Sequence, residues 1–164
     1  MIDERISLTI GPKKGLEQII NDNPDRQFKL FHSTGDKTEY MLLDYSGKKS
    51  IFHSDLDYYI INEINPGEFP QDYLECRYLT LNKDEQKVFK SIFNSWKSPE
   101  KRPAGLDSSI LLHALDDDFK FLLLNAWEDE DAFMVWDNDD QNQLCKFAHN
   151  SNETLVVKTY YPAK

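Results

Sequence analysis

The sequence lacks several features that would assign it to a compartment or a membrane. No stretch approaches the run of about 20 apolar residues that a membrane span needs. The acidic start, residues 1–5, contains no apolar segment of the kind found in a signal peptide. The absence of an apolar span or leader leads us to expect a cytoplasmic protein without a membrane segment. The two cysteines, Cys76 and Cys145, form no CxxC pair, and we expect both thiols to be reduced and to act as small buried side chains.

The common catalytic motifs are missing as well. The chain contains no G-x-S-x-G elbow, no P-loop and no G-x-G-x-x-G sequence. Carboxylates are abundant, but their sequence surroundings mark none of them as a general acid and base pair. A serine hydrolase, a P-loop nucleotide-binding protein and a Rossmann enzyme are therefore not indicated.

Basic residues are outnumbered by acidic ones, 19 to 29, and the formal net charge is -10. Acidic residues cluster at 116–118, 128–131 and 137–140. Such a surface repels phosphate backbones, so we expect no nucleic-acid partner. The third cluster lacks the D-x-D-x-D-G spacing with a distal glutamate that an EF-hand calcium loop needs. We interpret all three clusters as solvated turns and helix N-termini.

Apolar side chains are plentiful enough for a packed globular protein, at 40% hydrophobic and 13% aromatic residues. Residues 1–65 are predicted to fold in the order β-α-β-β-α. Alternation of apolar and polar residues predicts strands at 6–10, 28–32 and 40–45. Helical spacing of apolar residues predicts helices at 16–20 and 54–64, the second starting from a capping box of Ser54 and Asp57.

Residues 66–72 are predicted to be a linker, because proline and glycine in this stretch can continue neither flanking element. The second half, residues 73–164, then repeats the order of elements. Its pattern predicts a strand at 74–81, a helix at 82–96, a hairpin at 109–127, helices at 129–136 and 141–149, and a strand at 154–161.

Each half resembles a ferredoxin-like β-α-β-β unit. A sheet of this kind has helices on one face and leaves its other face apolar, so two such sheets bury both faces by packing together. The predicted fold class is α+β, with two ferredoxin-like halves of one chain forming a pseudo-dimeric α/β barrel.

Three segments carry a resemblance to a known family: R-Y-L-T-L-N-K-D at 77–84, L-N-A-W-E-D-E-D-A-F-M-V-W at 124–136, and K-T-Y-Y-P-A-K at 158–164. With them the chain resembles the dimeric α/β-barrel monooxygenase superfamily, also called ABM proteins. It is most similar to the longer heme-degrading monooxygenases of Gram-positive bacteria and to the target of RNAIII-activating protein family. The resemblance covers nearly the whole chain.

The resemblance implies three site positions. Heme-degrading members use an asparagine near bound oxygen, a tryptophan that presses on the porphyrin, and a histidine that ligates iron. Here the tryptophan position is Trp136, whereas the asparagine position is Arg77 and the histidine position is Lys146. A protonated lysine has no lone pair to give to iron, while Arg77 could pair with a heme propionate.

Two nearby residues are alternative metal ligands. His149 lies three residues beyond Lys146 and could share its helical face, and Cys145 could ligate as a thiolate. The simpler interpretation of His149 is a solvated histidine near a helix end. For Arg77 the simpler interpretation is an ordinary ion pair, and for Trp136 it is core packing.

The sequence thus leaves two main hypotheses open, beside the further possibility of a structural protein with no pocket. The first is an ABM-type enzyme that binds or oxidises heme, or another flat apolar ligand, with Trp136 and Arg77 as catalytic residues. Its cofactor-binding residues are expected to be His149, Lys146, Phe133 and Phe93, with His149 as the metal ligand. The second is a non-catalytic ligand-binding or regulatory protein on the same scaffold. Either would act as a monomer or a homodimer with a small apolar or porphyrin ligand.

Overall fold

The computed structural model describes residues 4–53, 56–66, 72–139, 142, 144 and 155–163. Within these ranges the elements are β1 (Arg5–Gly11), α1 (Lys13–Asp22), β2 (Phe28–Ser33), β3 (Tyr40–Asp44), β4 (Asp57–Ile64), β5 (Tyr73–Thr80), α2 (Lys83–Ser95), β6 (Leu106–Ala114), β7 (Lys120–Trp127), α3 (Glu130–Asp137) and β8 (Leu155–Pro162). None of the helices in these ranges is long and apolar enough to cross a membrane.

The strands form a closed barrel in the order β1-β3-β2-β8-β5-β7-β6-β4, with β4 pairing back to β1. The first four strands of the chain stand in the order β4-β1-β3-β2, and the last four stand in the corresponding order β8-β5-β7-β6. Antiparallel pairs β2–β8 and β4–β6 join the two sets. The predicted pseudo-dimeric α/β barrel is therefore confirmed.

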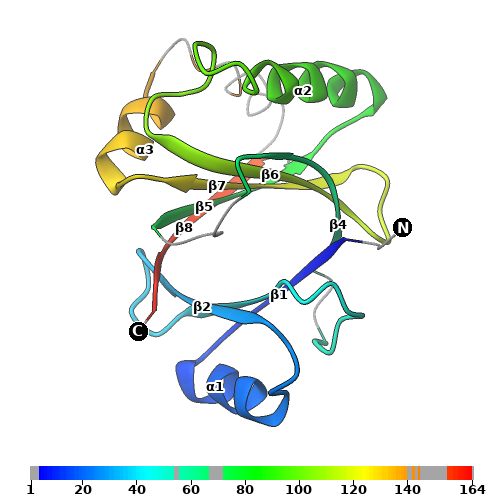
Figure 1. Ribbon diagram of the computed structural model, residues 1–164, viewed down its shortest axis with the longest axis vertical. Helices are drawn as coiled ribbons and strands as arrows, with labels where there is room; N and C mark the ends of the chain where they lie inside the picture. Colours follow the sequence, from blue (N-terminus) through cyan, green and yellow to red (C-terminus); the bar gives the residue numbers. More distant parts are fainter. Residues whose placement is uncertain are drawn as a thin grey trace.

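Figure 1 shows three layers, with α1 outside one wall of the barrel and with α2 and α3 outside the opposite wall. Alternate side chains of each strand face the barrel interior or the helices. One apolar core therefore fills the barrel, with Leu8, Phe31 and Leu112 among its members. A second core lies between α2, α3 and the sheet, and it is the one that borders the candidate site.

The predicted helix at 54–64 is wrong, because Asp57–Ile64 form strand β4. This strand closes the barrel by pairing with β1 on one side and β6 on the other. Its Tyr-Tyr-Ile-Ile sequence consists of aromatic and β-branched residues, which favour strands. The barrel interactions therefore override the apparent helical spacing. The capping-box residue Ser54 lies outside the described residues.

The other predicted elements that fall within the described residues agree with the structure, apart from small shifts of their ends. The capping box of α2 is present: Glu85 N donates to Asn82 Oδ1 over 2.8 Å, and Asn82 N donates to Glu85 Oε1 over 3.0 Å. Asp129 caps α3 in a similar way by accepting from Ala132 N. Most of the predicted helix at 141–149 lies outside the described residues.

One pH effect arises at the end of β4. Burial, and then the charge of Glu4, raise the pKa of Glu63. Because the folded-state pKa exceeds the unfolded one, this group's contribution to stability is complete below the unfolded pKa and is lost as pH rises through the folded pKa. We expect Glu63→Gln to melt at a higher temperature than the parent chain at pH 7, and the difference to disappear near pH ~4.

Melting curves recorded across this pH range check the expectation. Glu17→Gln is the matched control, since Glu17 is exposed on α1. A Glu63→Gln advantage that stays constant with pH, or that also appears in the control, would contradict a role for the partly buried Glu63 carboxyl group.

Candidate functional site

A cavity of about 490 Å³ lies between the C-terminal ends of α2 and α3. Its lining residues come from these two helices and from the loops that follow them. They are Ser95, Trp96, Lys101, Pro103, Trp136, Asp139 and Asn142. The cavity thus combines two aromatic side chains with polar and charged groups that could orient a ligand.

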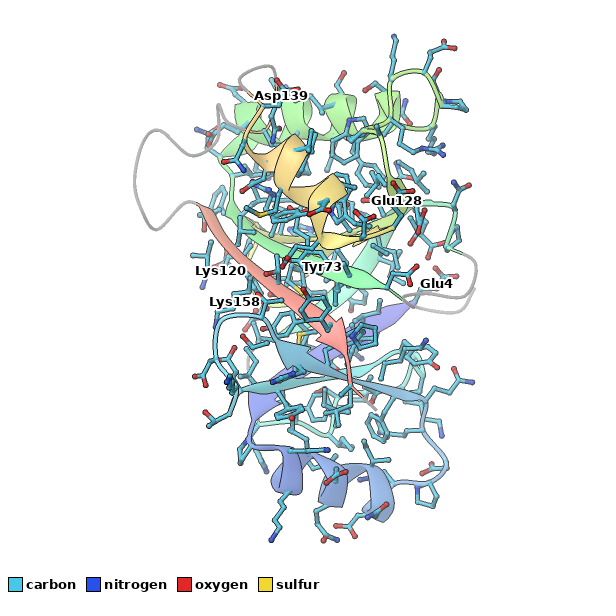
Figure 2. All side chains as sticks on the ribbon, turned by 90° about the vertical axis from the view of Figure 1, so that its left-hand side faces the viewer. Glu4, Tyr73, Lys120, Glu128, Asp139 and Lys158 are labelled. Atoms are coloured by element: carbon cyan, nitrogen blue, oxygen red, sulfur yellow. The ribbon has the colours of Figure 1, made fainter. Side chains whose placement is uncertain are left out.

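A second hollow of about 500 Å³ lies near the opposite end of α3. Figure 2 shows that the two hollows lie at opposite ends of α3. Glu128 and Tyr73 mark the start of the helix, and Asp139 lies beyond its end, beside α2. The second hollow is lined by five carboxylates and two tyrosines: Asp72, Glu128, Asp129, Glu130, Asp131, Tyr73 and Tyr161. Only the first hollow contains Trp136, so we take that one as the candidate site.

Three tryptophans meet at this cavity. The Trp136 ring is 5.1 Å from the Trp127 ring and 6.0 Å from the Trp96 ring, measured between centroids, and it meets Trp96 nearly edge-on at 80°. Trp127 and Trp96 are buried, whereas Trp136 remains partly exposed. Trp136 therefore packs against two buried tryptophans and presents part of its surface to the cavity, which Trp96 also lines.

Arg77 from β5 lies against the Trp136 ring. Its guanidinium carbon is 4.9 Å from the centroid of the Trp136 ring, within the range of a cation–π interaction. Arg77 Nε donates to Glu75 Oε2, and Arg77 Nη2 donates to Asp137 Oδ1 over 2.9 Å. The Arg77 side chain is only 3% exposed. It thus ties β5 to the end of α3 beneath the cavity.

Glu75 is the centre of a buried polar network. Its Oε1 atom accepts from Asn125 Nδ2 over 3.0 Å and from Trp127 Nε1 over 2.9 Å, while its Oε2 accepts from Arg77. Ser109 Oγ extends the network by donating to Asn125 Oδ1. Glu75 is 0% exposed, so these donors replace the water that a carboxylate would otherwise need.

The charge state of Arg77 follows from these contacts. Burial alone would lower the pKa of Arg77, but the charge of Glu75 and the hydrogen bonds with Asp137 and Glu75 raise it above its ordinary value. The guanidinium therefore stays protonated and cannot act as a base. It can hold an anion, polarise a neighbouring group or fix the position of Trp136.

The other site residues predicted from the sequence either lie in the core or fall outside the described residues. Phe93 and Phe133 are buried in the core beneath the helices and do not belong to the cavity lining. The predicted cofactor-binding residues His149 and Lys146 lie outside the described residues, as does Cys145. Within the described ranges, no group of three or more His, Cys, Asp or Glu side chains is arranged to hold a metal ion.

Three important residues were not singled out in the sequence: Glu75, Asn125 and Trp96. Glu75 and Arg77 share one face of β5, and opposite charges two residues apart on a strand are a usable signal for an ion pair. The partners Asn125 and Asp137 carry no such signal, because they meet Glu75 and Arg77 from 50 and 60 residues away.

The fold is shared with proteins related to ABM monooxygenases. No protein-family model matches the sequence. A ferredoxin-fold protein of Listeria monocytogenes, related to antibiotic biosynthesis monooxygenases, superposes with a TM-score of 0.80 at 16% identity, over 100% of this chain and 96% of that one. The ABM-like fold expected from the resemblance is therefore confirmed.

Two further solved structures with this fold belong to proteins described by an activity or a biological role. The heme-degrading enzyme LmHde from Listeria monocytogenes has a TM-score of 0.75 at 16% identity, with 98% of this chain and 100% of that chain covered. A staphylococcal protein described as a major regulator of staphylococcal pathogenesis has a TM-score of 0.73 at 18% identity, with the same coverage. At identities this low, the TM-scores establish a shared fold and nothing about activity. The activity has to be argued from the site.

Proposed function

We propose that this chain binds heme or another flat conjugated ligand in the cavity beside Trp136. The observation that carries the proposal is the partly exposed Trp136 ring, which borders a cavity of about 490 Å³. Trp96 forms a second aromatic wall. The shared fold with a heme-degrading enzyme makes heme the first ligand to test.

The described residues are compatible with heme in two respects. Aromatic rings at the cavity suit a flat porphyrin, and Lys101 on the lining provides a cation for a propionate. Bound heme would supply an iron centre for oxygen chemistry, while the chain would enclose the ring and exclude water. The candidate iron ligands, His149 and Cys145, lie outside the described residues.

A second candidate function is binding or regulation without catalysis, and the state of Arg77 favours it. The position that carries an asparagine in heme-degrading proteins holds an arginine whose donors engage Glu75 and Asp137. An arginine held in this way is suited to keeping Trp136 in place. The two functions share the ligand site and differ in whether the ligand is consumed.

A hemin titration tests both functions. We expect a Soret shift that saturates at one hemin per chain, and a loss of affinity of about tenfold or more in Trp136→Ala, because an aromatic wall disappears. Val135→Ala is the matched control, since the neighbouring Val135 side chain is 74% exposed. Bleaching of the Soret band after addition of a reductant in air indicates an oxygenase, and a stable band indicates a binding protein.

The binding proposal is contradicted if hemin associates without saturation, or if Trp136→Ala and Val135→Ala bind it equally well. His149→Ala is a further comparison. Loss of the Soret shift in this variant would identify His149 as an iron ligand, whereas an unchanged spectrum would remove it from consideration.

A further inference from the structure

Arg77 has two carboxylate partners that differ in how firmly they are held. Glu75 is 0% exposed and accepts hydrogen bonds from Arg77, Asn125 and Trp127. Asp137 is 37% exposed, and among the described residues its carboxylate accepts from Arg77 alone. Glu75 is thus the permanent counter-ion of the guanidinium, and Asp137 is the partner that can be exchanged with little loss.

The position of Asp137 in α3 points the same way. It is the last residue of the helix, where the unpaired backbone carbonyls carry a partial negative charge. A carboxylate is unfavourable at this end, and the last turn of α3 contains no basic residue to offset it. One guanidinium also faces two carboxylates here, so Asp137 contributes a surplus negative charge. The charged Asp137 carboxylate is therefore stabilised at the end of α3 by its ion pair with Arg77.

The exchangeable partner lies next to Trp136, although neither Asp137 nor Arg77 is itself among the cavity-lining residues. Asp137 follows Trp136 directly in the chain, and the Trp136 ring both borders the cavity and contacts the Arg77 guanidinium. Arg77 is 3% exposed and Asp137 is 37% exposed, so the Asp137 side of the guanidinium is the one nearer to solvent. A ligand that stacks on Trp136 therefore has an arginine within reach once Asp137 turns away.

From these observations we infer the chemical class of the ligand, an inference that rests on the proposed binding function. The ligand is a flat aromatic carboxylate whose ring packs against Trp136 and whose acid group displaces Asp137 from Arg77 Nη2. Asp137 occupies the acid subsite until the ligand arrives. Arg77 is then a specificity-determining residue, because Nη2 is a donor on a charged group and binds a carboxylate more strongly than a neutral acceptor.

Two probes of equal shape test this inference: 2-naphthoate, which carries the acid group, and 2-naphthamide, which does not. Binding is followed by quenching of tryptophan fluorescence. Asp137→Asn removes the competing carboxylate and leaves the Glu75–Arg77 pair intact. We expect it to bind 2-naphthoate roughly three- to fivefold more tightly than the parent chain, with 2-naphthamide unchanged.

Asp139→Asn is the matched control. It makes the same chemical change at another acidic residue of the cavity lining and reduces the net charge by the same amount. The inference predicts that this variant gains much less affinity for 2-naphthoate than Asp137→Asn does. Thermal melts of both variants confirm that each is folded before binding is compared.

Three results would overturn the inference. The first is an equal gain for both probes in Asp137→Asn, and the second is an equal gain in Asp139→Asn, which would reflect general electrostatics. The third is a preference for naphthoate that disappears in Lys101→Gln while Asp137→Asn has no effect, which would make Lys101 the acid receptor. Failure of the binding function itself looks different: neither hemin nor either probe would then bind in a Trp136-dependent manner.

Discussion

Arg77→Met is expected to lower the free energy of unfolding by about 3–5 kcal/mol, because it leaves a buried carboxylate without its cation. Glu75 is 0% exposed, and its remaining donors would be the neutral groups of Asn125 and Trp127. Urea unfolding at pH 7, followed by circular dichroism, measures the change.

Two comparison variants make this test specific. Arg5→Met breaks an ion pair with Asp57 whose side chains are 19% and 21% exposed, and it is expected to cost about 1 kcal/mol or less. The double variant Glu75→Gln, Arg77→Met removes the buried charge but keeps an oxygen acceptor for Asn125 and Trp127. It should recover most of the stability lost in the single variant. If Arg77→Met costs no more than Arg5→Met, the network is not desolvated as described.

Phe93→Ala is expected to be similarly damaging, at about 3–5 kcal/mol, through loss of buried apolar surface and creation of a cavity. Phe93 is 1% exposed on the inner face of α2, where its ring lies 6.0 Å from that of Trp96. Val88→Ala is the control on the same helix. Val88 is 43% exposed, and its truncation is expected to stay within about 0.5 kcal/mol.

A milder substitution at Phe93 separates packing from binding. Phe93 was predicted from sequence to contact the ligand, whereas the structure places it in the core behind Trp96. The milder variant Phe93→Leu should therefore lower stability and leave the hemin affinity within about twofold of the parent value. A large loss of affinity in a folded Phe93→Leu variant would return Phe93 to the ligand site.

Local sequence signals decide which of these elements can be predicted. Helix α2 was predictable because its capping box and its apolar spacing are local signals that agree with each other. Strand β4 was mistaken for a helix because its alternation is interrupted. A register shift between Ile60 and Asn62 moves the following residues to the opposite parity, which removes the period-two pattern of a strand.

The candidate site was only partly predictable for a related reason. Trp136 was recognised through a resemblance, and Arg77 was recognised as a departure from it. The network that determines what Arg77 can do depends on strand register, which pairs Glu75 with Asn125 and Asn125 with Ser109. A one-residue change of register would separate these groups, so no local sequence pattern specifies them.

The two seams of the barrel, β2–β8 and β4–β6, join halves that belong to the same polypeptide. In a barrel assembled from separate subunits, dilution favours dissociation and the melting temperature depends on protein concentration. Here closure of the barrel is unimolecular, so the cavity beside Trp136 is formed even at low protein concentration. The sequences of the two halves can also diverge independently. One half can then carry a binding site while the other only completes the barrel.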